Sequence, residues 1–145
     1  MKISLEPSNQ ETEVIIKGDI GSEEVQSILQ YLNNASTVST KVFLYKEDEQ
    51  FIVDISEIVY FEAYNNKVTA VTEKEKYETK LKLYEIKDKF SKHHFAQINK
   101  SVIVNINYVK SVQAEFSGNY TIKLKNSKEI LTISRKYFKD FKNQI

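Results

Sequence analysis

The stretch FAQINKSVIVNINYVKSV, residues 95–112, decides how the C-terminal part of this chain folds. Apolar residues alternate along it at Val102, Val104, Ile106 and Tyr108, and this spacing predicts a strand that turns one face to a core. The residues that lead into the strand, 99–101, are Asn, Lys and Ser. A core strand does not need such a polar entrance, so the question is what residues 99–101 face.

Two interpretations of the polar residues remain open. Asn and Ser side chains hydrogen-bond nearby backbone groups in turns, and for Asn105 and Asn107 this local interpretation is preferred. For residues 99–101 the alternative is that short donors and one cation face phosphate groups.

Length and composition predict one ordinary domain, or one small domain with a short attachment. The chain has 145 residues, of which 41% are hydrophobic and 28% charged, so it can bury a single core. No apolar run reaches bilayer length and no targeting segment is visible, so we expect no membrane insertion and a cytoplasmic location. The absence of cysteine excludes disulfides and thiolate metal sites.

The small net charge of +1 conceals two parts of opposite sign. Residues 1–50 hold four lysines and nine carboxylates, a balance of −5, whereas residues 51–145 hold seventeen Lys or Arg and eleven carboxylates, a balance of +6. This asymmetry favours an anionic partner, nucleic acid or a membrane surface, for the C-terminal part. Ordinary solvated lysines are the alternative explanation.

Residues 1–40 are predicted to form an acidic strand-strand-helix segment. Apolar residues at 3–5 and 14–16 predict two short strands, and Ser22 opens a helix. The apolar face of this helix is formed by Val25, Ile28, Leu29 and Leu32. The helical pattern ends at residues 33–36, which we interpret as a linker.

Residues 41–145 are predicted to form a mainly β, α+β domain of antiparallel hairpins. Strands are expected at 41–45, 51–55, 58–64, 67–72, 102–108, 109–116, 121–125 and 129–134. Asn65 and Asn66 suit the positive-φ positions of a tight hairpin turn. A short helix is expected from about Lys82, with Leu83, Ile86 and Phe90 inward. A final helix follows Ser134, with an apolar stripe at Tyr137, Phe138, Phe141 and Ile145.

Motifs for catalysis and cofactor binding are missing. The three glycines do not form a phosphate-binding loop, and no nucleophile with a partner base stands out. The adjacent His93 and His94 would point apart on a helix, and no third ligand lies at a useful spacing. We therefore expect no enzyme activity, no cofactor and no metal site.

Arg135 is the only arginine of the chain, and it falls in the first turn of the predicted final helix. A cation is disfavoured there by a few tenths of a kcal/mol to about 1 kcal/mol, so helix stability does not explain it. The forked guanidinium suits a base edge or a phosphate. A surface arginine paired with a carboxylate is the equally weighted alternative.

Four stretches together resemble the LytTR-type DNA-binding domain of bacterial transcriptional regulators. They are IVYFEAYNNKVTAVT, TKLKLYEIKDKF, FAQINKSVIVNINYVKSV and LTISRKYFKDFK, and the likeness covers roughly residues 40–145. The resemblance implies an elongated antiparallel β domain over 41–145, preceded by the small β-β-α segment. It also implies that the domain lies along DNA, sends loop residues into successive major grooves and bends the duplex.

The resemblance also implies a set of site residues. Arg135 corresponds to a base-contacting arginine and Lys100 to a position that contacts the DNA backbone, while Asn66 and Lys67 lie nearest to the groove-facing hairpin loop. The remaining candidate DNA-binding residues are Asn99, Ser101 and Lys136. Many relatives have His where this chain has Asn99, so any contact there would differ.

The resemblance implies double-stranded DNA with promoter repeats as the partner of a stand-alone regulator. Residues 1–40 are too few for a receiver domain, which needs about 100, and we expect them to pack on the domain or to pair subunits in a homodimer. The alternative is a protein-interaction module of the same fold that does not bind DNA and has a regulatory protein as its partner.

Overall fold

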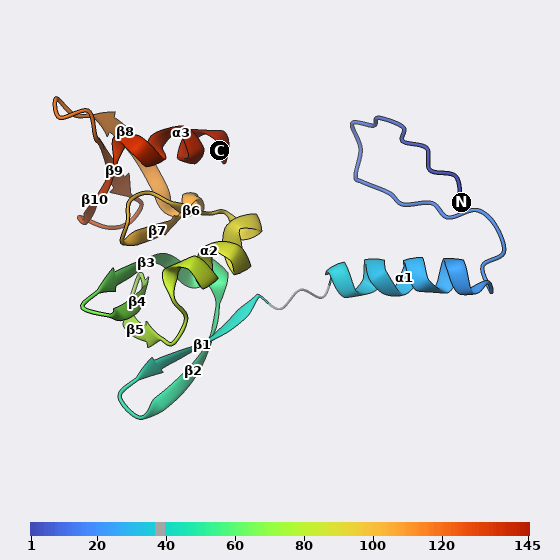
Figure 1. Cartoon of the computed structure of the whole chain (residues 1–145), viewed down its shortest axis with the longest axis horizontal. Coiled ribbons are helices and arrows are strands. Elements are labelled where there is room, and N and C mark those ends of the chain that lie inside the picture. The colour runs from blue at the N-terminus through green and yellow to red at the C-terminus, as the bar shows by residue number, and fades with distance from the viewer. Residues whose placement is uncertain (37–39) are drawn as a thin grey trace. The chain divides into compact units, whose positions relative to one another are not determined.

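The computed structural model describes residues 1–36 and 40–145, and the side chains of all of these except 33–36. The chain divides into two compact units, Met1–Ser39 and Thr40–Ile145. Figure 1 shows their elements along the chain. None of the described helices is long and apolar enough to cross a membrane.

Among its described residues, 1–36, the N-terminal unit contains one regular element, helix α1 (Glu23–Ser36). Ser22 Oγ accepts a hydrogen bond from the Val25 N–H over 3.3 Å, which caps the helix start, and Val25 is buried. The linker predicted at residues 33–36 is wrong, because α1 continues through Ser36. Asn and Ser cost a helix only a few tenths of a kcal/mol each, which does not stop it.

The two strands predicted at residues 3–5 and 14–16 are also wrong. Residues 1–22 contain no strand, and Ile3 and Leu5 are 75% and 92% exposed. A strand needs a hydrogen-bonded neighbour and a buried face, and these two short apolar segments find neither.

The C-terminal unit is built from two antiparallel sheets, as the predicted mainly β class requires. The seven-stranded sheet has the order β2-β1-β5-β4-β3-β7-β6 and the three-stranded sheet the order β10-β9-β8. The strands of the first are β1 (Lys41–Lys46), β2 (Glu49–Asp54), β3 (Ile58–Tyr64), β4 (Lys67–Thr72), β5 (Lys76–Thr79), β6 (Phe95–Gln97) and β7 (Val102–Asn105). Those of the second are β8 (Val109–Ala114), β9 (Tyr120–Leu124) and β10 (Ile130–Ile133), and the helices are α2 (Leu83–Phe90) and α3 (Arg135–Asn143).

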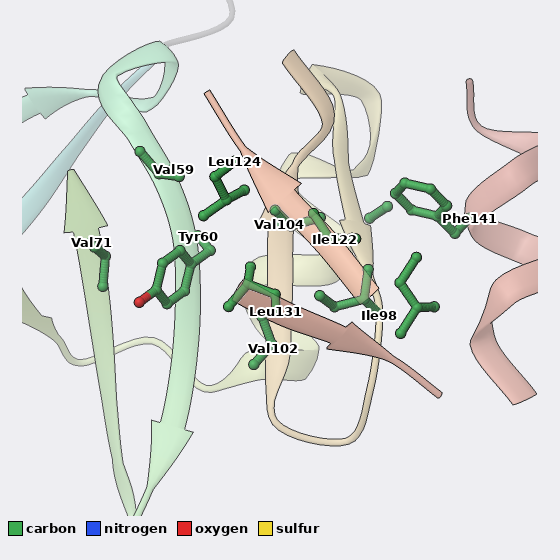
Figure 2. Close-up of a cluster of buried hydrophobic side chains, with 12 residues drawn as sticks. Val59, Tyr60, Val71, Ile98, Val102, Val104, Ile122, Leu124, Leu131 and Phe141 are labelled. Atoms are coloured by element: carbon green, nitrogen blue, oxygen red, sulfur yellow. The ribbon is translucent and has the colours of Figure 1, made fainter. Parts of the chain in front are cut away.

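Strand β7 is buried along its whole length, and not on alternate residues as the sequence suggested. Val102 and Val104 belong to one apolar cluster, together with residues of β9, β10 and α3 (Figure 2). Ile103 points to a second cluster, with residues of β1, β2 and α2. The seven-stranded sheet therefore has one core on each face, and β7 contributes to both.

The strand predicted to run to Tyr108 ends at Asn105, where a 3-10 turn over Ile106–Tyr108 begins. Asn105 is only 2% exposed, donates through Nδ2 to the Ile58 carbonyl over 3.0 Å and accepts through Oδ1 from the Asn107 N–H over 3.1 Å. The bond from the Asn107 N–H confirms the local interpretation of Asn105, and the bond to Ile58 adds a contact between two distant segments of the core.

Helix α3 starts where Ser134 predicted it, and its apolar stripe packs on the three-stranded sheet and on β6. Phe141 is buried, and the Phe138 ring stacks on Tyr120 of β9 with centroids 3.6 Å apart. The predicted stripe is wrong only at Ile145, which lies beyond the end of the helix and is 76% exposed.

Candidate nucleic-acid interface

Three turns and the start of α3 are joined by hydrogen bonds, made directly or by the adjoining strand residues, into one group that we call the loop cluster: residues 64–67, 98–101, 115–119 and 134–135. Two bonds connect the turn before β7 to its neighbours. The Ala63 N–H donates to the Ser101 carbonyl over 2.8 Å, at the end of β3. The Asn99 Nδ2 donates to the Thr132 carbonyl in β10 over 2.9 Å.

Two further bonds bring the start of α3 into the loop cluster. The Ser134 N–H donates to the Ile98 carbonyl over 2.9 Å, and the Arg135 N–H donates to Asn119 Oδ1 over 3.1 Å. Ser134 occupies the N-cap position in an extended conformation, but its side chain makes no capping bond. The turn that carries Lys100 and the helix start that carries Arg135 are therefore direct neighbours.

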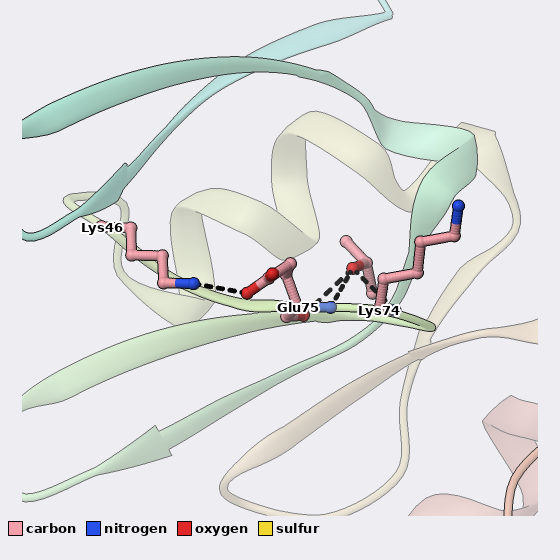
Figure 3. Close-up of polar contacts among 4 residues, drawn as sticks. Lys46, Lys74 and Glu75 are labelled. Carbon is pink, nitrogen blue, oxygen red and sulfur yellow. Dashed lines mark hydrogen bonds and ion pairs between the residues drawn. The ribbon is translucent and has the colours of Figure 1, made fainter.

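Lys100 and Arg135 are exposed, and no carboxylate of the described residues forms an ion pair with either. Other lysines do have partners. Lys46 Nζ lies 2.5 Å from Glu75 Oε2, and the hydrogen bond to this carboxylate raises the pKa of Lys46 (Figure 3). The interpretation of Arg135 as a carboxylate-paired surface residue is thus not supported by the described contacts.

The β3–β4 turn has the geometry predicted from its two asparagines. Asn65 and Asn66 have φ values of 49° and 62°, as a tight hairpin turn requires. Both residues are exposed. The next residue, Lys67, lies 3.6 Å from Glu78, with both side chains more than 60% exposed. Such exposed pairs contribute little, so Lys67 can exchange Glu78 for an external anion at small cost.

The remaining predicted site residues differ in how their side chains are engaged. Asn99 uses both ends of its carboxamide inside the domain, because Oδ1 accepts from the Ser101 N–H over 2.8 Å and Nδ2 bonds Thr132. Ser101 is half-buried, and Lys136 is exposed with its Nζ 6.0 Å from the Tyr137 ring centroid.

One residue that contacts the site was missed in the sequence. No sequence pattern singles out Asn119, whose Oδ1 accepts a hydrogen bond from the first backbone N–H of α3, 16 residues further along the chain. No local spacing connects the two residues, because the contact arises only when the three-stranded sheet folds against α3.

A pocket of about 240 Å³ lies outside the loop cluster, between strands β3 to β5 and the β9–β10 turn. At its wall the Tyr60 hydroxyl donates to Glu129 Oε2 over 2.6 Å, and burial raises the pKa of Tyr60. No group of three His, Asp or Glu side chains suited to a metal ion occurs in the described part of the chain.

Comparison with known proteins gives a consistent result. The model of the LytTr DNA-binding domain family matches residues 48–145. Two proteins of Staphylococcus aureus strains, both named as HTH-type transcriptional regulators, are 33% identical over 147 residues, covering 100% of this chain and 98% of theirs. A solved LytTr DNA-binding domain from Bacillus cereus shares the fold, with a TM-score of 0.68 and 24% identity over 73% of this chain and 96% of that one.

Proposed function

This chain belongs to the LytTR family of DNA-binding domains and is a DNA-binding transcriptional regulator, and we propose that the loop cluster is the surface that recognises the DNA. It thus belongs to a family of regulators and not to a family of enzymes. The observation that carries the proposal is the adjacency of Lys100 and Arg135 on hydrogen-bonded turns, with no carboxylate paired to either among the described residues.

Loops, and not a helix pair, deliver the contacts in this proposal. Helices α2 and α3 are separated in sequence by the five strands β6 to β10, so they do not form a helix-turn-helix unit. The loop cluster instead projects from the ends of strands, and we propose that its turns enter successive major grooves and bend the duplex. Bending costs of order 1–6 kcal/mol, which the additional contacts along the bent DNA would repay.

The two cations have different roles in this proposal. Arg135 reads a base, because its guanidinium can donate two parallel hydrogen bonds to the O6 and N7 atoms of guanine. Lys100 contacts a phosphate, because an ammonium group is a point charge without such geometric selectivity. Ser101 and Lys136 add phosphate contacts on either side.

The β3–β4 turn supplies a second point of contact through Asn66 and Lys67. Both side chains are exposed, and the hydrogen bond between Ala63 and Ser101 holds this turn beside Lys100. For Asn99 we propose an indirect role: it holds the Lys100 turn against β10, since both ends of its carboxamide are engaged within the domain.

The test starts from a duplex that the full-length protein enriches from a random library. Arg135→Ala should cost about 1–3 kcal/mol on this duplex and relax the preference at one base pair. Lys100→Ala should weaken binding to all duplexes similarly and lower the slope of log K against log salt by about one unit.

Lys46→Ala is the matched control. It removes the same charge from an exposed side chain whose partner, Glu75, lies in the β4–β5 turn, at the other end of β4 from Asn66. It should leave the base preference unchanged and should change the slope of log K against log salt by less than one unit. Equal binding by the wild type, Arg135→Ala and Lys100→Ala would rule out the loop cluster as the recognition surface.

We also propose that the protein acts in the cytoplasm as a homodimer, through its N-terminal unit. The support is that α1 leaves apolar side chains exposed, with Leu29 at 38% and Tyr31 at 74%, and that two-fold proteins match paired DNA half-sites. Sedimentation equilibrium of the wild type and Leu29→Asp tests this, because the substitution should convert a dimer into a monomer. A monomeric wild type at DNA-binding concentrations would contradict the proposal.

A further inference from the structure

Arg135 is contacted by the β8–β9 turn, for which no sequence pattern indicates a function. The β8–β9 turn, residues 115–119, contacts it twice. Asn119 Oδ1 accepts the Arg135 N–H over 3.1 Å, and a methyl group built on Gly118 would lie 3.4 Å from both Cδ and Nη1 of Arg135. The arginine is thus fixed at its backbone by one residue and lies against the bare backbone of the other.

The Asn119 contact replaces the missing cap of α3. The first backbone N–H groups of a helix have no partner within the helix, and the Ser134 side chain provides none. The Asn119 carboxamide does, through Oδ1. The backbone of Asn119 is itself held in place, because its backbone N–H donates to Ser117 Oγ over 3.3 Å and its backbone carbonyl accepts from the Glu115 N–H over 2.9 Å. The direction of the first α3 turn is therefore set by the β8–β9 turn.

The absence of a side chain at Gly118 leaves room for the guanidinium of Arg135. Gly118 has φ +90°, a conformation that side chains disfavour, and the three atoms nearest to the position of an added Cβ, its chain neighbours apart, belong to Arg135. A methyl group would just touch the arginine. Any larger side chain would take the space in which Cδ and Nη1 now lie.

We propose that Gly118 and Asn119 are positioning residues that set the direction of Arg135 and so determine how strictly one base pair of the DNA site is read. This inference rests on the proposed function, because it requires that Arg135 reads a base. A bidentate contact depends on the alignment of both donors, so a small tilt of the guanidinium lowers discrimination more than it lowers general affinity.

Two substitutions of Gly118 separate crowding from backbone strain. Asparagine tolerates positive φ better than alanine does, but its carboxamide would displace the guanidinium. If strain dominates, Gly118→Ala is the worse variant. If crowding of Arg135 dominates, as we infer, Gly118→Asn loses about threefold to tenfold in discrimination at one base pair and Gly118→Ala loses much less.

Two substitutions of Asn119 test the other contact. Asn119→Ala removes the acceptor for the Arg135 N–H, and it should reduce discrimination at the same base pair about threefold to tenfold. Asn119→Asp keeps an acceptor oxygen in the same position. It should retain the base preference while its added negative charge weakens binding to all duplexes alike.

The experiment uses the full-length protein and a labelled duplex of the sequence it enriches from a random library, with every single base-pair variant. Each substitution is measured alone and combined with Arg135→Ala, and thermal unfolding is followed in parallel. Because the positioning residues act through Arg135, their effect on base preference should vanish in the Arg135→Ala background.

The outcomes distinguish this inference from the proposed function. If Arg135→Ala relaxes one base pair but Gly118→Asn and Asn119→Ala do not, only the positioning inference is refuted. The same follows if their effects persist without the arginine or affect all duplexes equally. If no duplex is enriched, or if Arg135→Ala changes no preference, the proposed role of Arg135 fails and this inference fails with it.

Discussion

Asn99 is the residue at which a direct contact with DNA and a purely internal role predict different measurements. Its Nδ2 donates to Thr132 and its Oδ1 accepts from the Ser101 N–H, so Asn99→Ala removes two hydrogen bonds at a half-buried site. Each bond contributes about 0.5–1.5 kcal/mol. Because water can partly replace the lost hydrogen bonds, we expect a loss of about 1–2 kcal/mol in the free energy of unfolding.

The assay is urea and thermal unfolding followed by circular dichroism and tyrosine fluorescence, since the chain has nine tyrosines and no tryptophan. For a unit of this size the expected loss lowers the melting temperature by about 4–8 °C. Asn99→Asp should lose at least as much, because its carboxylate would face the Thr132 carbonyl. Asn107→Ala, at an exposed asparagine, is the matched control and should stay within about 0.5 kcal/mol of wild type.

DNA binding supplies the second measurement. If Asn99 acts by holding the Lys100 turn, Asn99→Ala weakens binding to all duplexes at an unchanged salt slope, because no charge is removed. An Asn99→Ala protein with wild-type stability but reduced affinity would refute the internal role and would make Asn99 a direct DNA contact.

Three further substitutions test the hydrogen bonds of two buried residues and the titration of one carboxylate. Asn105→Ala should cost about 2–4 kcal/mol in urea unfolding, because it leaves the Ile58 carbonyl buried without its partner; a loss below about 0.5 kcal/mol would contradict the structural role. Tyr60→Phe keeps the ring in the core but removes the bond to Glu129, so it should cost about 1 kcal/mol and leave DNA affinity unchanged. Asp54 has its pKa lowered from 3.8 to about 2, chiefly by a bond from the backbone N–H two residues on. Its contribution is therefore complete above pH about 4 and lost as the pH falls toward 2, so the stability of Asp54→Asn should fall less over that range than that of wild type, whereas parallel curves would count against this assignment.

The sequence predicted elements well where apolar runs flank clear turn residues or apolar residues recur at helical spacing. The hairpin of β3 and β4 follows from two apolar runs around Asn65 and Asn66, and both asparagines have the required positive φ. The buried face of α2 follows from the helical spacing of Ile86 and Phe90. In both cases the signal is local, so it can be read without knowing the rest of the fold.

Features that depend on distant partners could not be predicted. Strand β5 was overlooked because its sequence, KYET, is charged, yet it lies between β4 and β1 and pairs with both. The reverse holds at residues 3–5 and 14–16, where alternation in the first and a short apolar run in the second predict strands that find no neighbour. Pairing with neighbouring strands decides whether a weakly patterned segment becomes a strand, and the sequence of the segment alone does not determine this pairing.

The candidate site shows the same division. Arg135 and Lys100 stand out by residue type and position, and the structure makes their turns neighbours, but their roles toward DNA stay predictions. Asn119 and Gly118 carry no local signal, because their importance comes from contacts made across the three-stranded sheet.

The double burial of β7 has a consequence for how this strand finds its alignment. In most half-buried strands, sliding by one residue would turn polar side chains inward, and this penalty fixes the pairing. Val102, Ile103 and Val104 are apolar on both sides, so a slide would merely exchange one aliphatic group for another. Asn105 removes this ambiguity, because only one alignment lets its amide reach the Ile58 carbonyl. The same alignment determines the position of the preceding turn, which carries Lys100.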